Sequence, residues 1–269
     1  MILQQIFKGE SEIINSISEK YFSDFKEIVD TRLNIKGMRR FLFGTFLVTC
    51  FMVGIPLLNI ANSEDWKTIG WSQISDFWKL FFCFELVLAS FQILILLFCW
   101  KENNFNQKIL SILIIIYGYK MSIDPYVFIS YAAMDRGGFE NIKIYLLFIL
   151  LLGLLLHFIF LYSWISKLKK GGFSLNGNKD TKKASNSFKF LFPIIFVILT
   201  FSVLLIRRIP EFEIVILVIG SIIILIGMAY AVCEFIIAAF CIFRFPSFSV
   251  NPPQKKQAFI NKKRKKSKR

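Results

Sequence analysis

The chain has 269 residues, of which 55% are hydrophobic and 17% aromatic, and its mean hydropathy is +0.58. This composition excludes an ordinary soluble domain, in which roughly half of the residues or fewer are apolar. The net charge of +15 does not indicate nucleic-acid binding, because the basic residues flank apolar segments instead of alternating with exposed aromatic residues. We therefore expect an all-α polytopic integral membrane protein, a helical bundle whose principal partner is the lipid bilayer. The abundance of Phe, Ile, Asn and Lys is typical of an AT-rich bacterial genome.

The first 40 residues are predicted to be a cytoplasmic segment with one amphipathic helix between residues 11 and 34. Between residues 10 and 30, six acidic residues oppose two lysines, so anionic lipid headgroups would repel the polar face. One interpretation is docking on protein, either on this chain's own cytoplasmic segments or on a partner protein. The other is a helix lying flat at the membrane interface as a lead-in to the first span. The apolar residues recur at helical spacings of three and four: Ile14, Ile17, Tyr21, Phe25 and Ile28.

Residues 41–243 are predicted to form the membrane domain, because they contain six segments that can each cross a bilayer as a helix. Crossing a hydrocarbon core of about 30 Å takes about 20 mainly apolar residues. The third segment holds charged residues, and the sixth is longer than one untilted crossing requires. Because Arg207 and Arg208 follow the fifth segment, a re-entrant hairpin is an alternative for the last two. The segments are residues 41–60, 77–100, 109–134, 144–165, 188–206 and 214–243.

The distribution of Lys and Arg predicts that both ends of the chain lie in the cytoplasm at the cell membrane. The segments expected on the cytoplasmic side, including the 166–187 loop, hold 26 basic residues, whereas those on the opposite side hold 5. Residues 244–269 form a polybasic tail, which we expect to anchor the topology and to attract anionic inner-leaflet lipids. An acidic protein partner for this tail is the alternative.

A candidate polar site lies in the third segment, because ionisable groups inside a bilayer are costly and mark functional positions. Four polar residues recur at spacings of three, four and seven, within about 60° of one another on a helix: Tyr117, Lys120, Asp124 and Tyr131. Such a stripe should face the bundle or a wet cavity and not lipid. Glu85 in the second segment lies at a similar depth and is expected to join Lys120 and Asp124 in an ionic cluster.

Three interpretations of this stripe remain open from the sequence. It is a structural ion pair that locks helix packing, a substrate or ion pathway, or a loop that leaves the membrane after Tyr119. Pro125 removes one backbone donor and predicts a kink or break beside the charges. His157, the only histidine, has no partner at metal-ligand spacing, so we expect it to make a hydrogen bond between helices and to hold neither zinc nor haem.

No complete catalytic, metal-binding or nucleotide-binding motif is present in the sequence, so we expect neither an enzyme nor a bound cofactor. The five cysteines lie in apolar segments without a CxxC pattern and are interpreted as reduced apolar side chains. The leading hypothesis is a non-enzymatic membrane protein of the transport or immunity class, such as an accessory subunit, a small permease or a protector against membrane-active peptides. The alternative is a membrane-embedded enzyme acting on a lipid or a peptide bond.

Overall fold

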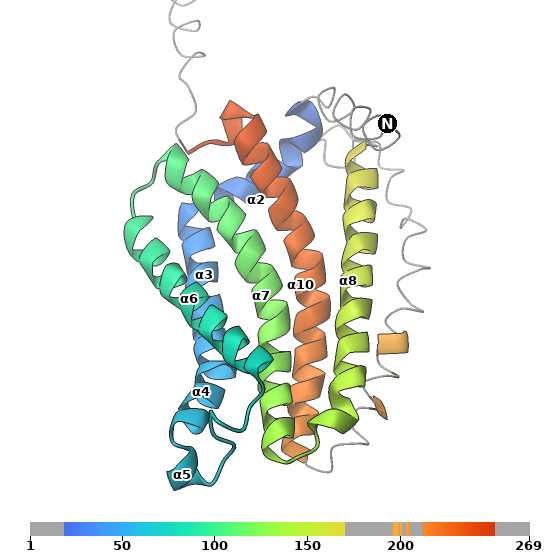
Figure 1. Ribbon diagram of the computed structural model, residues 1–269. Coiled ribbons are helices and arrows are strands. Elements are labelled where there is room, and N and C mark those ends of the chain that lie inside the picture. The colour runs from blue at the N-terminus through green and yellow to red at the C-terminus, as the bar shows by residue number, and fades with distance from the viewer. Residues whose placement is uncertain (1–18, 170–195, 199, 201–202, 205–211, 251–269) are drawn as a thin grey trace, which may run out of the picture.

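The computed structural model describes residues 19–169, 196–198, 200, 203–204 and 212–250. All regular structure in these ranges is helical, and the long helices lie side by side as a bundle (Figure 1). The short elements are η1 (Glu19–Phe22), α2 (Ser23–Thr31), α4 (Gly54–Ala61), α5 (Ser63–Trp66) and η3 (Pro246–Phe248). The long helices are α3 (Ile35–Met52), α6 (Asp76–Phe98), α7 (Asn104–Asp135), α8 (Phe139–Lys169) and α10 (Phe212–Arg244).

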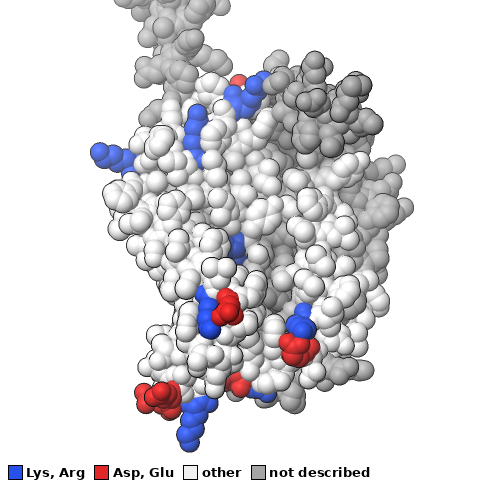
Figure 2. Space-filling model, in the orientation of Figure 1, with Lys and Arg blue, Asp and Glu red and all other residues white. Residues whose placement is uncertain are grey.

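Within the described part of the chain, five helical segments are long and apolar enough to cross a membrane. They are Ile35–Ala61, Asp76–Phe98, Asn104–Asp135, Phe139–Leu168 and Ile216–Arg244. They coincide with the first four and the sixth of the predicted segments, which supports the prediction of an all-helical bundle. Figure 2 shows the charged side chains on one face mainly towards the two ends, with a largely uncharged band between them. Most of the predicted fifth segment, most of the 166–187 loop and the tail beyond residue 250 lie outside the described residues.

Asparagine and proline residues account for several helix boundaries. The Asn34 side chain accepts a hydrogen bond from the Gly37 amide at 2.8 Å and caps α3. The first predicted span is divided into α3 and α4, because the ring of Pro56 crowds the carbonyl four residues earlier, that of Met52, where α3 ends. Ile35–Ala61 nevertheless remains long enough, as two consecutive helices, to cross a membrane.

Helix α7 is the centre of the bundle and packs against α3, α8 and α10. Of the most apolar stretch of α7, 61% is buried inside the bundle, compared with 22% of the corresponding stretch of α6. The helix continues through Pro125 to Asp135, so the interpretation that a loop follows Tyr119 is wrong, and so is the predicted break at Pro125. Neighbouring helices shield the polar groups of α7, which explains why a helix with these charges fits an apolar bundle.

Two glycines let helices approach α10 closely. A Cβ on Gly118 of α7 would lie 2.8 Å from Val232, and one on Gly153 of α8 would lie 2.7 Å from Leu225. Small residues of this kind allow close helix packing in membranes, where apolar burial alone does not drive helices together.

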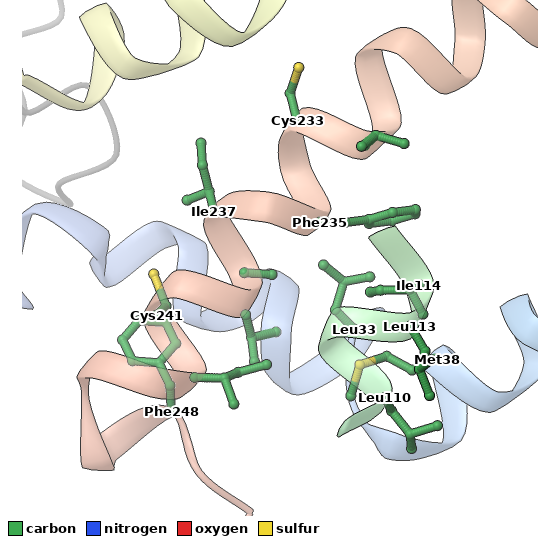
Figure 3. Close-up of a cluster of buried hydrophobic side chains, with 14 of the residues drawn as sticks. Leu33, Met38, Leu110, Leu113, Ile114, Cys233, Phe235, Ile237, Cys241 and Phe248 are labelled. Carbon is green, nitrogen blue, oxygen red and sulfur yellow. The ribbon is translucent and has the colours of Figure 1, made fainter. Parts of the chain in front are cut away.

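Helix α2 docks on the end of the bundle where α10 terminates. Phe22 and Phe25 are fully buried, with ring centroids 5.3 Å from Phe245 and 6.1 Å from Trp164, respectively. In Figure 3, side chains of the adjoining core from α7, α10 and the α2–α3 segment lie together. The apolar face of the amphipathic segment is therefore covered by this chain's own helices in the described part. Ile14 and Ile17 of the predicted stripe lie outside that part.

Candidate functional site

A buried ionic cluster joins α3, α6 and α7 inside the bundle. The Lys120 ammonium donates hydrogen bonds to both oxygens of Asp124 at 2.8 Å and to Thr49 Oγ1 at 3.0 Å. Its Nζ also lies 2.5 Å from Glu85 Oε2, an ion contact without good hydrogen-bond alignment. None of these four residues is more than 7% exposed. The structure thus brings together Glu85, Lys120 and Asp124, as the sequence predicts, and adds Thr49.

The two carboxylates of the cluster are held unequally. Asp124 accepts two hydrogen bonds from Lys120 and one from the Thr49 hydroxyl at 2.6 Å. Glu85 has only the close contact with Lys120. One ammonium therefore faces two carboxylates, and the cluster carries a surplus negative charge unless a proton or a cation neutralises it.

A second polar layer lies next to the cluster, between the same three helices. Gln92 of α6 donates to the Leu42 carbonyl at 2.7 Å and to Thr45 Oγ1 at 2.8 Å on α3. Tyr117 of α7 donates to the Leu88 carbonyl of α6 at 2.8 Å. An ion contact and a hydrogen bond thus connect α6 to α7 at this depth, and α6 packs chiefly against α3.

Tyr131 and His157 lie away from the ionic cluster. Tyr131 is seven residues beyond Asp124, about 10 Å along the helix axis, and packs in a separate apolar group with Val53 and Phe82. His157 of α8 is 3% exposed, and both of its ring nitrogens have a hydrogen-bond partner. Nε2 lies 2.6 Å from the Tyr119 hydroxyl, and Nδ1 lies 2.9 Å from the Ala229 carbonyl.

The hydrogen bonds of His157 define its tautomer. A carbonyl oxygen only accepts, so Nδ1 carries a proton and donates it to the Ala229 carbonyl, and in the tautomer protonated at Nδ1 the Nε2 atom accepts from the Tyr119 hydroxyl. The side chain joins α7, α8 and α10, which is the interhelical hydrogen bond expected from the sequence. Cys233 lies beside the ring, with its sulfur 3.6 Å from Nδ1.

Sequence reasoning missed the polar partners on α3 and α6. Thr45 and Thr49 are four residues apart and so share one face of a helix, and Gln92 follows Glu85 by seven residues on one face of α6. Both spacings were available as signals. Short hydroxyl and amide side chains are common in membrane helices, however, and the spacings alone do not show which of them meet an ion.

Among the described residues, no group of three or more His, Cys, Asp or Glu side chains is placed to hold a metal ion. All five cysteines are free. Comparison with protein-family models, with curated proteins and with solved structures finds no match to this chain. The case for a function therefore rests on the chemistry of the buried polar groups.

Proposed function

We propose that the chain is a non-enzymatic multi-pass membrane protein of the transport class. In this proposal the cluster of Glu85, Lys120 and Asp124 takes up and releases protons as they cross the membrane. The observation that carries the proposal is the buried arrangement of two carboxylates around one ammonium. Ionisable residues inside a membrane bundle are rare and are typical of ion pathways and proton relays.

Glu85 is the proposed proton carrier, because it has the weaker set of partners. Asp124 accepts three hydrogen bonds, two from Lys120 and one from Thr49. When Glu85 binds a proton, its attraction to Lys120 falls, and when it releases the proton the attraction returns. The proton therefore controls a contact between α6, which carries Glu85, and α7, which carries Lys120.

The packing of α6 favours a coupling between this proton and helix movement. Only 22% of the most apolar stretch of α6 is buried, which is the smallest share among the described spans. Helix α6 packs chiefly against α3. A change in one strong polar contact is thus opposed by little apolar packing. A two-state element biased by a charge change is the physical requirement for such a switch.

Proton flux into liposomes tests the proposal. The purified chain is reconstituted into liposomes that enclose a pH-sensitive dye, and a membrane potential that is negative inside is imposed. We expect faster proton entry than in empty liposomes, and a return to the empty-liposome rate in Glu85→Gln, which is isosteric but holds no exchangeable carboxyl proton. Asp76→Asn is the matched control, because it removes an exposed carboxylate paired with Lys79 on the same helix and should keep the flux.

A different result would favour the accessory or immunity class. If wild-type liposomes admit protons no faster than empty ones, the proton-relay proposal is wrong. An accessory protein should then tolerate joint replacement of Glu85, Lys120 and Asp124 by apolar residues in a host that needs the chain. Its activity should instead depend on the docked helix α2, whose outer face carries the exposed carboxylates Glu27 and Asp30.

A further inference from the structure

A groove opens between the first turns of α3 and the last turns of α6. Its volume is about 780 Å³, within the range of roughly 300–1,000 Å³ typical of ligand sites. Its walls are apolar and include Phe43 and Phe46 on α3 and Ile93 and Leu97 on α6. The stretch from Ile93 on α6 to Trp100, two residues beyond the end of α6, gives the wall a length of about 10 Å.

Three basic residues lie together at one end of this groove: Lys36, Arg39 and Arg40. The Arg39 guanidinium lies over the Trp100 ring, with Cζ 3.7 Å from the centroid. A guanidinium stacked by its face still presents its N–H edges, which suit the paired oxygens of a phosphate. The Arg39 Nε is enclosed and has no hydrogen-bond partner among the described residues.

The remaining charges at this end leave a net positive site. Lys36 lies 3.4 Å from Glu102, an exposed pair that largely cancels. Arg40 is exposed and has no ion-pair partner in the described part of the chain. Arg39 and Arg40 thus add two positive charges above a wall that is apolar along its length.

We propose that this groove binds one anionic glycerophospholipid, with its phosphate on Arg39 and Arg40 and its acyl chains against Phe43, Phe46 and Leu97. The arrangement of charged and apolar groups favours this occupant. A phospholipid has its charge at the membrane surface and its acyl chains below, and the groove likewise has its arginines at one end and its apolar walls below them. The amphipathic Trp100, 69% exposed, lies where indole rings prefer to be, at the level of the headgroups. This site shares no residue with the polybasic tail or with the Glu85–Lys120–Asp124 cluster.

Quenching of Trp100 by lipids with brominated acyl chains tests the proposal on the full chain in detergent. The signal of Trp100 is the difference between the wild type and Trp100→Phe. We expect brominated phosphatidylglycerol to reach half-maximal quenching at a mole fraction at least about fivefold lower than brominated phosphatidylcholine. The preference should fall below about twofold in Arg39→Gln/Arg40→Gln, and excess inorganic phosphate should not reverse the quenching.

The control is Lys67→Gln/Lys143→Gln, which removes two exposed positive charges from the opposite end of the bundle. It should keep the full preference for phosphatidylglycerol. If the double arginine variant does not fold, as judged by circular dichroism, Arg40→Gln alone serves, because it leaves the stacking of Arg39 on Trp100 in place. Equal quenching by the two lipids, or a preference that survives loss of the arginines, overturns the proposal. Displacement by inorganic phosphate would do so as well, because it would identify a site for a soluble anion.

Discussion

Thr49 and Asp124 are 75 residues apart in the chain, yet a 2.6 Å hydrogen bond joins them between α3 and α7. The Thr49 hydroxyl donates this bond and accepts another from Lys120, so it orders the ammonium and the carboxylate at once. Asp124 is thereby held as an acceptor of three hydrogen bonds. Glu85 has no such support and makes only the close contact with Lys120.

Replacing one member of the cluster should destabilise the fold more than replacing all of its charges. In Lys120→Leu the buried carboxylate of Asp124 loses its partner, and a loss of about 3–5 kcal/mol in the free energy of unfolding is expected. Lys120→Leu/Asp124→Leu removes both charges, so this double variant should recover most of the loss, and adding Glu85→Gln should change the stability little further. Thermal unfolding of the variants in detergent measures the effect. Strictly additive losses across the series would mean that the three residues are not coupled.

Gly153→Ala should destabilise the contact of α8 with α10. The new methyl group would lie 2.7–2.8 Å from three atoms of Leu225, including its branching carbon, so the whole side chain must move, at a cost of about 1–3 kcal/mol. Gly220→Ala is the control, since a Cβ there meets nothing within 4 Å and alanine favours a helix. The unfolding temperature should fall in Gly153→Ala and should stay the same or rise in Gly220→Ala. An unchanged unfolding temperature in Gly153→Ala would contradict the close packing.

Apolar burial, and not the ion pair, should hold α2 on the bundle. Phe25 is fully buried, and burying a phenylalanine is worth about 1.5–3 kcal/mol. In the pair of Arg32 with Glu234 the arginine side chain is 65% exposed, so solvent screens the attraction. Hydrogen exchange of the α2 amides should accelerate strongly in Phe25→Ser and only slightly in Arg32→Gln. The reverse order would mean that the ion pair dominates.

The cytoplasmic placement of both termini is tested with fused reporters. A reporter that is active only in the cytoplasm should be active after Asn186 or Arg269 and silent after Asp65 or Gly138. The reason is the excess of Lys and Arg in the segments on the side of the termini. Activity after Asp65 would contradict this orientation.

The sequence predicted the helical bundle because a long apolar segment in a membrane has to satisfy its own backbone hydrogen bonds, which a helix does. It also predicted the meeting of Glu85, Lys120 and Asp124, because charges at similar depth in apolar segments need one another. It did not predict that Tyr131 lies outside the cluster. Residues on one helical face can pack in different surroundings, and here Tyr131 packs in a separate apolar group. The break before Pro56 went unpredicted although a proline was present, whereas the break expected at Pro125 is absent. Packing around α7 on several sides keeps that helix continuous, and α4 lies at the end of the bundle with fewer neighbours.

Infrared spectroscopy of the chain in lipid at neutral pH tests the central claim most directly, which is that the cluster holds a proton on Glu85. The carbonyl stretch of a protonated carboxyl group is separate from the bands of ionised carboxylates. We predict a protonated-carboxyl band that disappears in Glu85→Gln and persists in Glu234→Gln, in which another buried glutamate is replaced. Absence of this band from the wild type, or its persistence in Glu85→Gln, would contradict the claim.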